Sequence, residues 1–205
     1  SLNAIYDNRV SGLVGDYFLA SALIRSIQTG NLRIVRIISQ LGKDLSEGEI
    51  KQLETAEESI LDESCYLQVI RKKTAMLLSG CAEIGALSAR ADESLVTTCR
   101  NFGEYLGYAF QIKDDIFDYF KENQIGEGKV TLPLLYALRQ GGTQAEQMTR
   151  IIREKDFTQA HVEELIAFAK TSGGIEYATQ RMQEYYRLAL EQIQQLPLSA
   201  AREAL

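Results

Sequence analysis

The chain has 205 residues, of which 45% are hydrophobic and 24% are charged, a composition typical of a globular protein and unlike that of a disordered or fibrous chain. At about 150 residues per domain, this length favours a single domain over residues 1–205. The 22 Lys and Arg residues against 28 Asp and Glu residues give a net charge of −6. This charge excludes a broad positive surface, so we expect no nucleic-acid partner, and any anionic ligand has to meet a local site.

The cysteines and the apolar segments predict a cytoplasmic protein. Cys65, Cys81 and Cys99 are far apart and lack the paired CxxC spacing of zinc sites and redox motifs. The sequence has no uninterrupted apolar run of about 18 residues. Its first residues, Ser1–Ala4, have no basic segment that leads into an apolar stretch. We therefore expect neither a membrane span nor a signal peptide, and no stable membrane insertion.

The prolines and the apolar spacing predict an all-α fold. Pro133 and Pro197 are the only prolines, so the first 132 residues contain none of the residue that most reliably ends a helix. In chain order, helical spacing predicts helices over residues 4–28, 32–41, 47–79, 93–120, 159–171 and 175–195. Alternation typical of strands is scarce.

Capping signals divide these helices. Two pairs, Ser46 with Glu49 and Thr143 with Glu146, have the spacing of capping boxes. Four single residues are further candidate N-caps, namely Asn31, Asp92, Thr131 and Thr158.

The helix predicted over residues 93–120 has two glycines four residues apart, Gly103 and Gly107. Each costs about 1 kcal/mol of helix propensity relative to alanine, so we expect them where a neighbouring helix approaches closely. The polar, glycine-bearing residues 121–130 are predicted to form a loop. Pro133 then stands where the first turn of the next helix tolerates a missing N–H.

The sharpest group of candidate functional residues lies near the end of this long helix: Gln111, Asp114, Asp115 and Asp118. At about 100° per residue, the three carboxylates should converge on one patch. Their mutual repulsion would be relieved by a divalent cation. Carboxylate oxygens suit Mg²⁺, which is commonly held by one or two carboxylates together with substrate phosphates. A magnesium and diphosphate site is one interpretation, and a solvated acidic helix end is the other.

Apolar neighbours favour the first interpretation. Five of them surround the acids in place of the mixed-sign charges of a solvent-facing surface, namely Phe110, Ile112, Ile116, Phe117 and Phe120. We therefore expect the acids to line the wall of a cavity.

Four segments resemble motifs of the trans-type isoprenyl diphosphate synthases. The stretch Gly107–Tyr119 closely resembles the second aspartate-rich motif of that family. Ile70–Ala75 is similar to its Lys-Thr motif, Gly128–Pro133 to its GKxTLP segment, and Val14–Tyr17 to its GD-bearing helix. The family has an all-α fold, a helical bundle around a deep central cavity, and its members are usually homodimers. The resemblance implies this isoprenoid-synthase-type fold and a homodimer here.

The resemblance also implies a metal site. Asp114, Asp115 and Asp118 match the residues that bind Mg²⁺, which in turn bridges the allylic diphosphate, and Asp114 is the strongest candidate. His161, the only histidine, lies far along the chain in another helix, and we expect it to be structural.

The matching residues for the substrate are Lys73, Thr74, Gln111 and Lys129. The two lysines would bind the diphosphate and neutralise leaving-group charge, while Thr74 and Gln111 would contact it near the reacting carbon. The implied activity is that of a Mg²⁺-dependent prenyltransferase, which condenses isopentenyl diphosphate with an allylic diphosphate by 1′-4 head-to-tail elongation. Electrostatic stabilisation of the departing diphosphate would carry most of this catalysis.

The sequence departs from the family pattern in two places. The first aspartate-rich motif and the two arginines after it should precede a segment such as Leu2–Tyr6, where this chain begins. Relatives also usually carry several more residues between Gly126 and Glu127. We therefore expect this sequence to be part of a longer enzyme. Without the missing segments, the chain should not convert substrate. The alternative is a non-catalytic subunit or remnant of the same fold that acts as a helical interaction partner.

Overall fold

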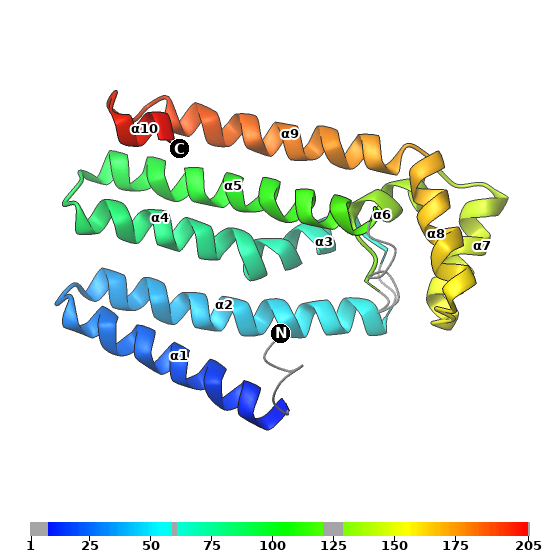
Figure 1. Ribbon diagram of the computed structural model, residues 1–205, viewed down its shortest axis with the longest axis horizontal. Helices are drawn as coiled ribbons and strands as arrows, with labels where there is room; N and C mark the ends of the chain where they lie inside the picture. Colours follow the sequence, from blue (N-terminus) through cyan, green and yellow to red (C-terminus); the bar gives the residue numbers. More distant parts are fainter. Residues whose placement is uncertain (1–7, 59–60, 121–128, 205) are drawn as a thin grey trace.

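The computed structural model describes residues 8–58, 61–120 and 129–204, which form helices joined by short connections, with no strand among them (Figure 1). The predicted all-α fold is confirmed. In chain order the elements are α1 (Asn8–Gln28), α2 (Leu32–Glu57), α3 (Glu63–Ile70), the π-helical turn η2 (Arg71–Ala75), α4 (Met76–Ser88), α5 (Glu93–Asp118), α6 (Leu132–Arg139), α7 (Thr143–Glu154), α8 (Gln159–Thr171), α9 (Gly174–Ile193) and α10 (Ala200–Ala204).

The long helices form a layered bundle around α5. This helix packs along α4 on one side and along α9 on the other, while α2 lies beyond α4 and α1 lies beyond α2 (Figure 1). α7 and α8 lie at the end of the bundle where α5 finishes, and they run across the direction of the long helices (Figure 1). The helices that supply the candidate site residues therefore meet at one end of the molecule.

Two clusters of buried side chains hold this end together. One cluster joins α3, α5, α6 and α9 and consists of Tyr66, Ile70, Ile112, Leu132, Leu135 and Ala178. The other joins α6, α7 and α8 and includes Leu134, Met148, Leu165 and Phe168. Fully burying a side chain of this size contributes about 1.5–3 kcal/mol.

Residues beside the helix ends set several boundaries as predicted. The side chains of Asn31, Asp92 and Thr158 accept a hydrogen bond from a backbone N–H in the first turn of α2, α5 and α8. Thr131 is the N-cap of α6, although its side chain makes no capping bond. The helices predicted over residues 93–120, 159–171 and 175–195 match α5, α8 and α9 to within two residues at each end. The predicted caps are confirmed at these four positions.

Both predicted capping boxes are wrong. Ser46 lies inside α2, where its hydroxyl donates to the carbonyl oxygen of Gly42 at 3.1 Å, so one helix continues past position 46. The N-cap of α7 is Gly142, with a φ of 92°, and Thr143 is already helical. At the first site the helix continues in spite of the local pattern, and at the second a glycine adopts a backbone conformation that L side chains rarely adopt.

The helix predicted over residues 47–79 is also wrong as a single element. α2 ends at Glu57, and α3 begins at Glu63 after the N-cap Asp62, whose side chain accepts from the N–H of Cys65 at 3.0 Å. Asp62 thus marks a helix start inside the segment that the apolar spacing predicted to be continuous.

Close approach of neighbouring elements explains Gly103 and Gly107. A Cβ atom at Gly103 would lie 2.5 Å from the carbonyl oxygen of Leu78 in α4. A Cβ atom at Gly107 would lie 2.4 Å from the Cα atom of Ala75 in η2. Both distances are far shorter than any van der Waals contact, so the predicted role of these glycines is confirmed.

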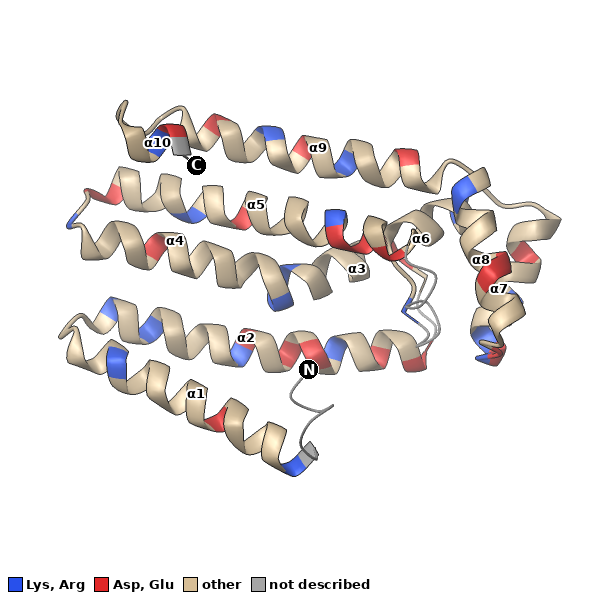
Figure 2. Ribbon diagram, in the orientation of Figure 1, with Lys and Arg blue, Asp and Glu red and all other residues tan. Residues whose placement is uncertain are grey.

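α1 is the most exposed of the long helices and packs mainly against α2. Its Leu13 and Tyr17 side chains are 67% and 69% exposed, and it is sparsely charged along its length (Figure 2). By length and composition, residues Arg9–Gln28 are apolar enough to cross a membrane. The segment contains Asp16 and Arg25, so it is not an uninterrupted apolar run. Exposed apolar patches equally mark surfaces that pack against protein, so the absence of membrane insertion stays a prediction.

Candidate functional site

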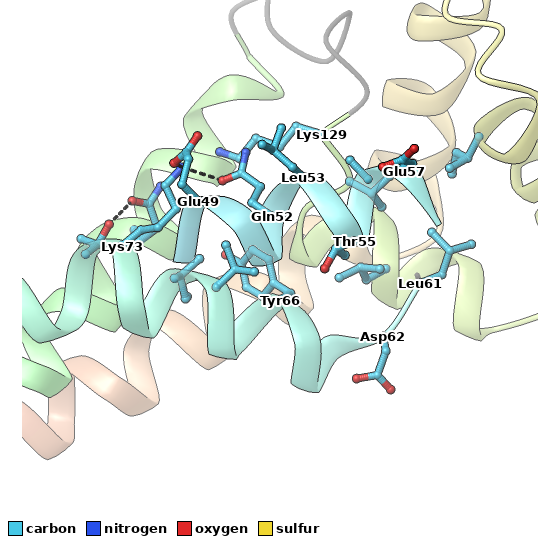
Figure 3. Close-up of a pocket in the computed structure, with 18 of the residues that line it drawn as sticks. Glu49, Gln52, Leu53, Thr55, Glu57, Leu61, Asp62, Tyr66, Lys73 and Lys129 are labelled. Carbon is cyan, nitrogen blue, oxygen red and sulfur yellow. Dashed lines mark hydrogen bonds and ion pairs between the residues drawn. The ribbon is translucent and has the colours of Figure 1, made fainter. Parts of the chain in front are cut away.

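A cavity of about 780 Å³ lies where α2, α3 and η2 face the end of α5, a volume typical of small-molecule sites (Figure 3). Its lining includes all four residues predicted to contact the substrate, namely Lys73, Thr74, Gln111 and Lys129. These residues come from three separate parts of the chain, so only the tertiary fold brings them together. The cavity is therefore the candidate functional site.

The Lys-Thr pair stands on the π-helical turn η2. The N–H of Met76 donates to the carbonyl oxygen of Arg71, five residues earlier, in place of the usual four. Such a turn widens the helix by one residue and changes the direction in which the following side chains point, and it is frequent at functional sites. Here both Lys73 and Thr74 line the cavity. Sequence reasoning predicted an uninterrupted α-helix at these residues and missed this turn.

A chain of hydrogen bonds connects the predicted substrate residues. The Thr74 hydroxyl donates to Oε1 of Gln111 at 2.7 Å, and Nε2 of Gln111 donates to Oδ1 of Asp115 at 3.2 Å. Nζ of Lys129 donates to the same Oδ1 at 2.7 Å. The network ties η2, α5 and the segment before α6 into one polar unit at the cavity wall.

Asp115 is the buried centre of this network. Its side chain has no exposed surface, and its second oxygen, Oδ2, accepts a hydrogen bond from the Tyr66 hydroxyl at 2.7 Å. Burial, followed by the charge of Asp115, raises the pKa of Tyr66 well above its ordinary value of 10. The phenol therefore keeps its proton at physiological pH and remains a donor. Sequence reasoning missed Tyr66, because its partner lies 49 residues away along the chain.

The three predicted metal-binding aspartates differ in their surroundings. Asp115 is buried, Asp118 is half-buried and Asp114 is exposed. Within the described ranges, no three His, Cys, Asp or Glu side chains lie close enough together to hold a metal ion by themselves. The three aspartates therefore do not form a metal site by themselves, and their binding of Mg²⁺ stays a prediction. Adjacent residues on a helix point about 100° apart, so Asp115 faces Tyr66 and Lys129 while Asp114 faces outward.

Asp114 and Asp118 still fit a magnesium ion that is also held by phosphate. The two residues are four apart on α5, the spacing that makes side chains neighbours on a helix surface. Mg²⁺ is usually held by one or two protein carboxylates, with waters and substrate phosphates completing its shell. A pair of carboxylates at the end of α5 matches this donor set.

The predicted apolar wall around the acids is only partly present. Ile112 is fully buried and Ile116 packs against the same core cluster, but Phe110, Phe117 and Phe120 are exposed. Phe110, Asp114 and Phe117 are spaced by four and three residues along α5, and therefore share one exposed face. Among the described residues, neither these aromatic side chains nor the three aspartates line the cavity of Figure 3, so the prediction that the acids line its wall is wrong for this cavity.

Two other predictions concern residues outside the cavity. Nδ1 of His161 lies 2.8 Å from the backbone oxygen of Asp156 and 3.1 Å from its Oδ2, which is a local contact near the start of α8. His161 does not line the cavity, in agreement with a structural role. The predicted loop after Phe120 and the expected gap beside Gly126 fall on residues 121–128, which lie outside the described residues.

The family model described as Polyprenyl synthetase matches residues 1–169. The octaprenyl diphosphate synthase of Haemophilus influenzae is 32% identical over 212 aligned residues, which cover 99% of this chain and 64% of that protein. Heptaprenyl diphosphate synthase component 2 of Bacillus subtilis is 32% identical and is covered over 61% of its length, against 100% of this chain. The chain thus spans less than two thirds of the length of these relatives.

Solved structures share the fold over nearly the whole chain. The crystal structure of a geranylgeranyl pyrophosphate synthase from Bacteroides thetaiotaomicron is 44% identical, with a TM-score of 0.91, and is covered over 70% of its length by 99% of this chain. The polyprenyl synthase of Caulobacter crescentus, in complex with calcium and isoprenyl diphosphate, is 29% identical with a TM-score of 0.92. That match covers 98% of this chain and 65% of the other.

Proposed function

The chain belongs to the polyprenyl synthetase family, and we propose that it forms the diphosphate-binding part of a prenyltransferase that joins isopentenyl diphosphate to an allylic diphosphate. The single observation that carries this proposal is the cavity lined by Lys73, Thr74, Gln111 and Lys129, with a hydrogen-bond network behind it. Its two ammonium groups, paired with Glu49 and Asp115, are the cationic hydrogen-bond donors that a diphosphate would meet there.

The proposed chemistry begins with cleavage of the bond between the allylic carbon and the diphosphate oxygen. The electron pair of this bond leaves with the diphosphate, where Lys73 and Lys129 stabilise the developing negative charge. The double bond of isopentenyl diphosphate then attacks the allylic carbon, and a proton is lost to the departing diphosphate. Lys129 is held against Asp115 and Gln111 against Thr74, so both are positioned before the substrate binds.

We assign different roles to the aspartates. Asp114 and Asp118 would hold Mg²⁺ together with diphosphate oxygens, and the ion would supply charge neutralisation of the leaving group. Asp115, for which the sequence predicts metal binding, instead has both oxygens engaged by Lys129, Gln111 and Tyr66. We therefore propose that Asp115 positions Lys129.

A product assay on the full-length protein tests the proposed activity. With labelled isopentenyl diphosphate, an allylic diphosphate and Mg²⁺, we expect elongated prenyl diphosphates. Asp114→Ala should abolish their formation while the helical circular-dichroism signal is retained. Glu54→Ala is the matched control, because it removes another exposed carboxylate from a long helix, and that carboxylate does not line the cavity. Full activity of Asp114→Ala would contradict the metal assignment.

A non-catalytic subunit is the second candidate; the name of one relative, component 2 of its synthase, indicates only that some synthases have more than one component. The two functions differ in ligand binding. A catalytic diphosphate site predicts that pyrophosphate with Mg²⁺ raises the melting temperature, whereas a scaffold predicts no change. The homodimer, the cytoplasmic location and the single domain over residues 1–205 stay predictions, and light scattering measures the first of them.

A further inference from the structure

Two side chains of α2 hold the ammonium group of Lys73. Nζ of Lys73 lies 2.6 Å from Oε2 of Glu49 in an ion pair, and it donates a hydrogen bond to Oε1 of Gln52 at 2.6 Å. Both α2 residues line the same cavity, beside Lys73 (Figure 3). We propose that Glu49 and Gln52 are positioning residues that hold Lys73 where it meets a diphosphate. This proposal rests on the diphosphate site proposed above.

The backbone is shaped for this contact. Glu49 and Gln52 are three residues apart on α2 and therefore share one face of the helix. Gly48 precedes them, and a Cβ atom there would lie 2.9 Å from Cγ of Lys73 and 3.3 Å from its backbone nitrogen. A larger residue would push α2 away from η2. Gly48 thus sets the separation at which both side chains reach the lysine.

The neighbouring lysine shows that the pairing is selective. Lys72 forms an ion pair with Glu47, one residue before Gly48, and does not line the cavity. The two consecutive lysines of η2 thus pair with different glutamates of α2, which stand on either side of Gly48. Of the two lysines, only Lys73 lines the cavity. The close approach of α2 to η2 at Gly48 and the separate ion pairs of Lys72 and Lys73 argue against an accidental surface contact.

Positioning matters here because a free lysine has many rotamers. Fixing a lysine side chain costs more conformational entropy than fixing most other side chains. Where the protein already holds the ammonium group, a ligand does not have to order it. An ammonium group has three donors, and the contacts with Glu49 and Gln52 leave one for the ligand. The neutral amide of Gln52 can keep its contact beside an anion without repelling it.

The first test needs no ligand. Amine acetylation of the folded protein is followed by mass spectrometry, with Lys51 of the same helix as internal reference. Gln52→Ala and Glu49→Gln should each raise the modification rate of Lys73 several-fold relative to Lys51, because the first removes a hydrogen-bond acceptor of its nitrogen and the second removes the charge of its ion-pair partner. Glu57→Gln is the matched control, since it removes the same charge from α2 at the same cavity and does not contact Lys73 in the described structure. Equal rates in all four proteins, or an equal rise in Glu57→Gln, would overturn the positioning contact.

The second test measures binding of inorganic pyrophosphate with Mg²⁺ by titration calorimetry. Gln52→Ala should weaken the affinity about fivefold, the effect expected when one long side chain is no longer ordered beforehand. In a Lys73→Ala background the same substitution should have no further effect. An equal loss in both backgrounds would overturn the proposal, because Gln52 would then act without Lys73. If the unchanged protein does not bind pyrophosphate, the proposed function fails, and the acetylation result still decides whether the contact exists.

Discussion

Substitution of Gly107 by alanine tests how closely α5 packs against the turn that carries the Lys-Thr pair. The added Cβ atom would lie 2.4 Å from Cα, 3.1 Å from Cβ and 3.2 Å from the backbone nitrogen of Ala75. Two of these three atoms belong to the main chain of η2, which cannot rotate away as a flexible side chain can. The two elements therefore have to move apart.

The size of the effect follows from two opposing contributions. Alanine gains about 1 kcal/mol of helix propensity over glycine, while overpacking of a well-packed core typically costs about 1–3 kcal/mol and occasionally more. A contact with the main chain belongs at or above the upper end of this range, so we expect a net loss of about 2 kcal/mol. For a chain of this size, such a loss lowers the melting temperature by about 6 °C.

Thermal unfolding followed by circular dichroism at 222 nm measures this shift. Gly85→Ala is the control, because Gly85 lies in α4 with no atom within 4 Å of an added Cβ. Alanine there should raise the melting temperature by about 3 °C through helix propensity alone. Displacement of η2 should also weaken pyrophosphate binding in Gly107→Ala and not in Gly85→Ala. A Gly107→Ala protein that melts at or above the unchanged protein would refute the close-packing argument.

Three further predictions concern the buried network. Tyr66→Phe removes the donor to Oδ2 of Asp115 and should lower the free energy of unfolding by about 2 kcal/mol in urea titrations, with Tyr105→Phe as a near-neutral control. Lys129→Met should lower the free energy of unfolding by about 1 kcal/mol, a modest loss because the lysine is partly exposed. A double-mutant cycle with Asp115→Asn should show coupling between the two positions, and additive losses would contradict the ion pair. Burial raises the pKa of Tyr66 and of Tyr119, so both phenols keep their protons above pH 10 in the folded protein, while the tyrosines of the unfolded chain lose theirs. The free energy of unfolding should therefore fall as the pH rises from about 10. A urea midpoint that does not fall in this range would contradict the prediction.

Local signals in the sequence determined the fold class and several boundaries. The N-caps Asn31, Asp92 and Thr158 act on backbone groups two or three residues away, so the information needed to recognise them is contiguous. The spacing of Gly103 and Gly107 likewise indicated a close approach. The resemblance of four segments to one family identified Lys73 and Lys129, which the structure then places at one cavity.

Only the tertiary structure decided which aspartate is buried, where the helices break and what holds Lys73. Asp114 and Asp115 are identical in type and adjacent in sequence, yet one faces outward and the other is enclosed by Tyr66 and Lys129. Partners separated by 14 to 49 residues leave no periodic signal, because their meeting depends on how whole helices pack. The π-helical turn η2 also depends on the tertiary structure, because no local signal in the sequence predicted it. Its neighbours α2 and α5 approach it closely at Gly48 and Gly107. Short-range hydrogen bonds depend on neighbouring residues and can be predicted from them, whereas burial and long-range pairing are decided only when the helices pack together.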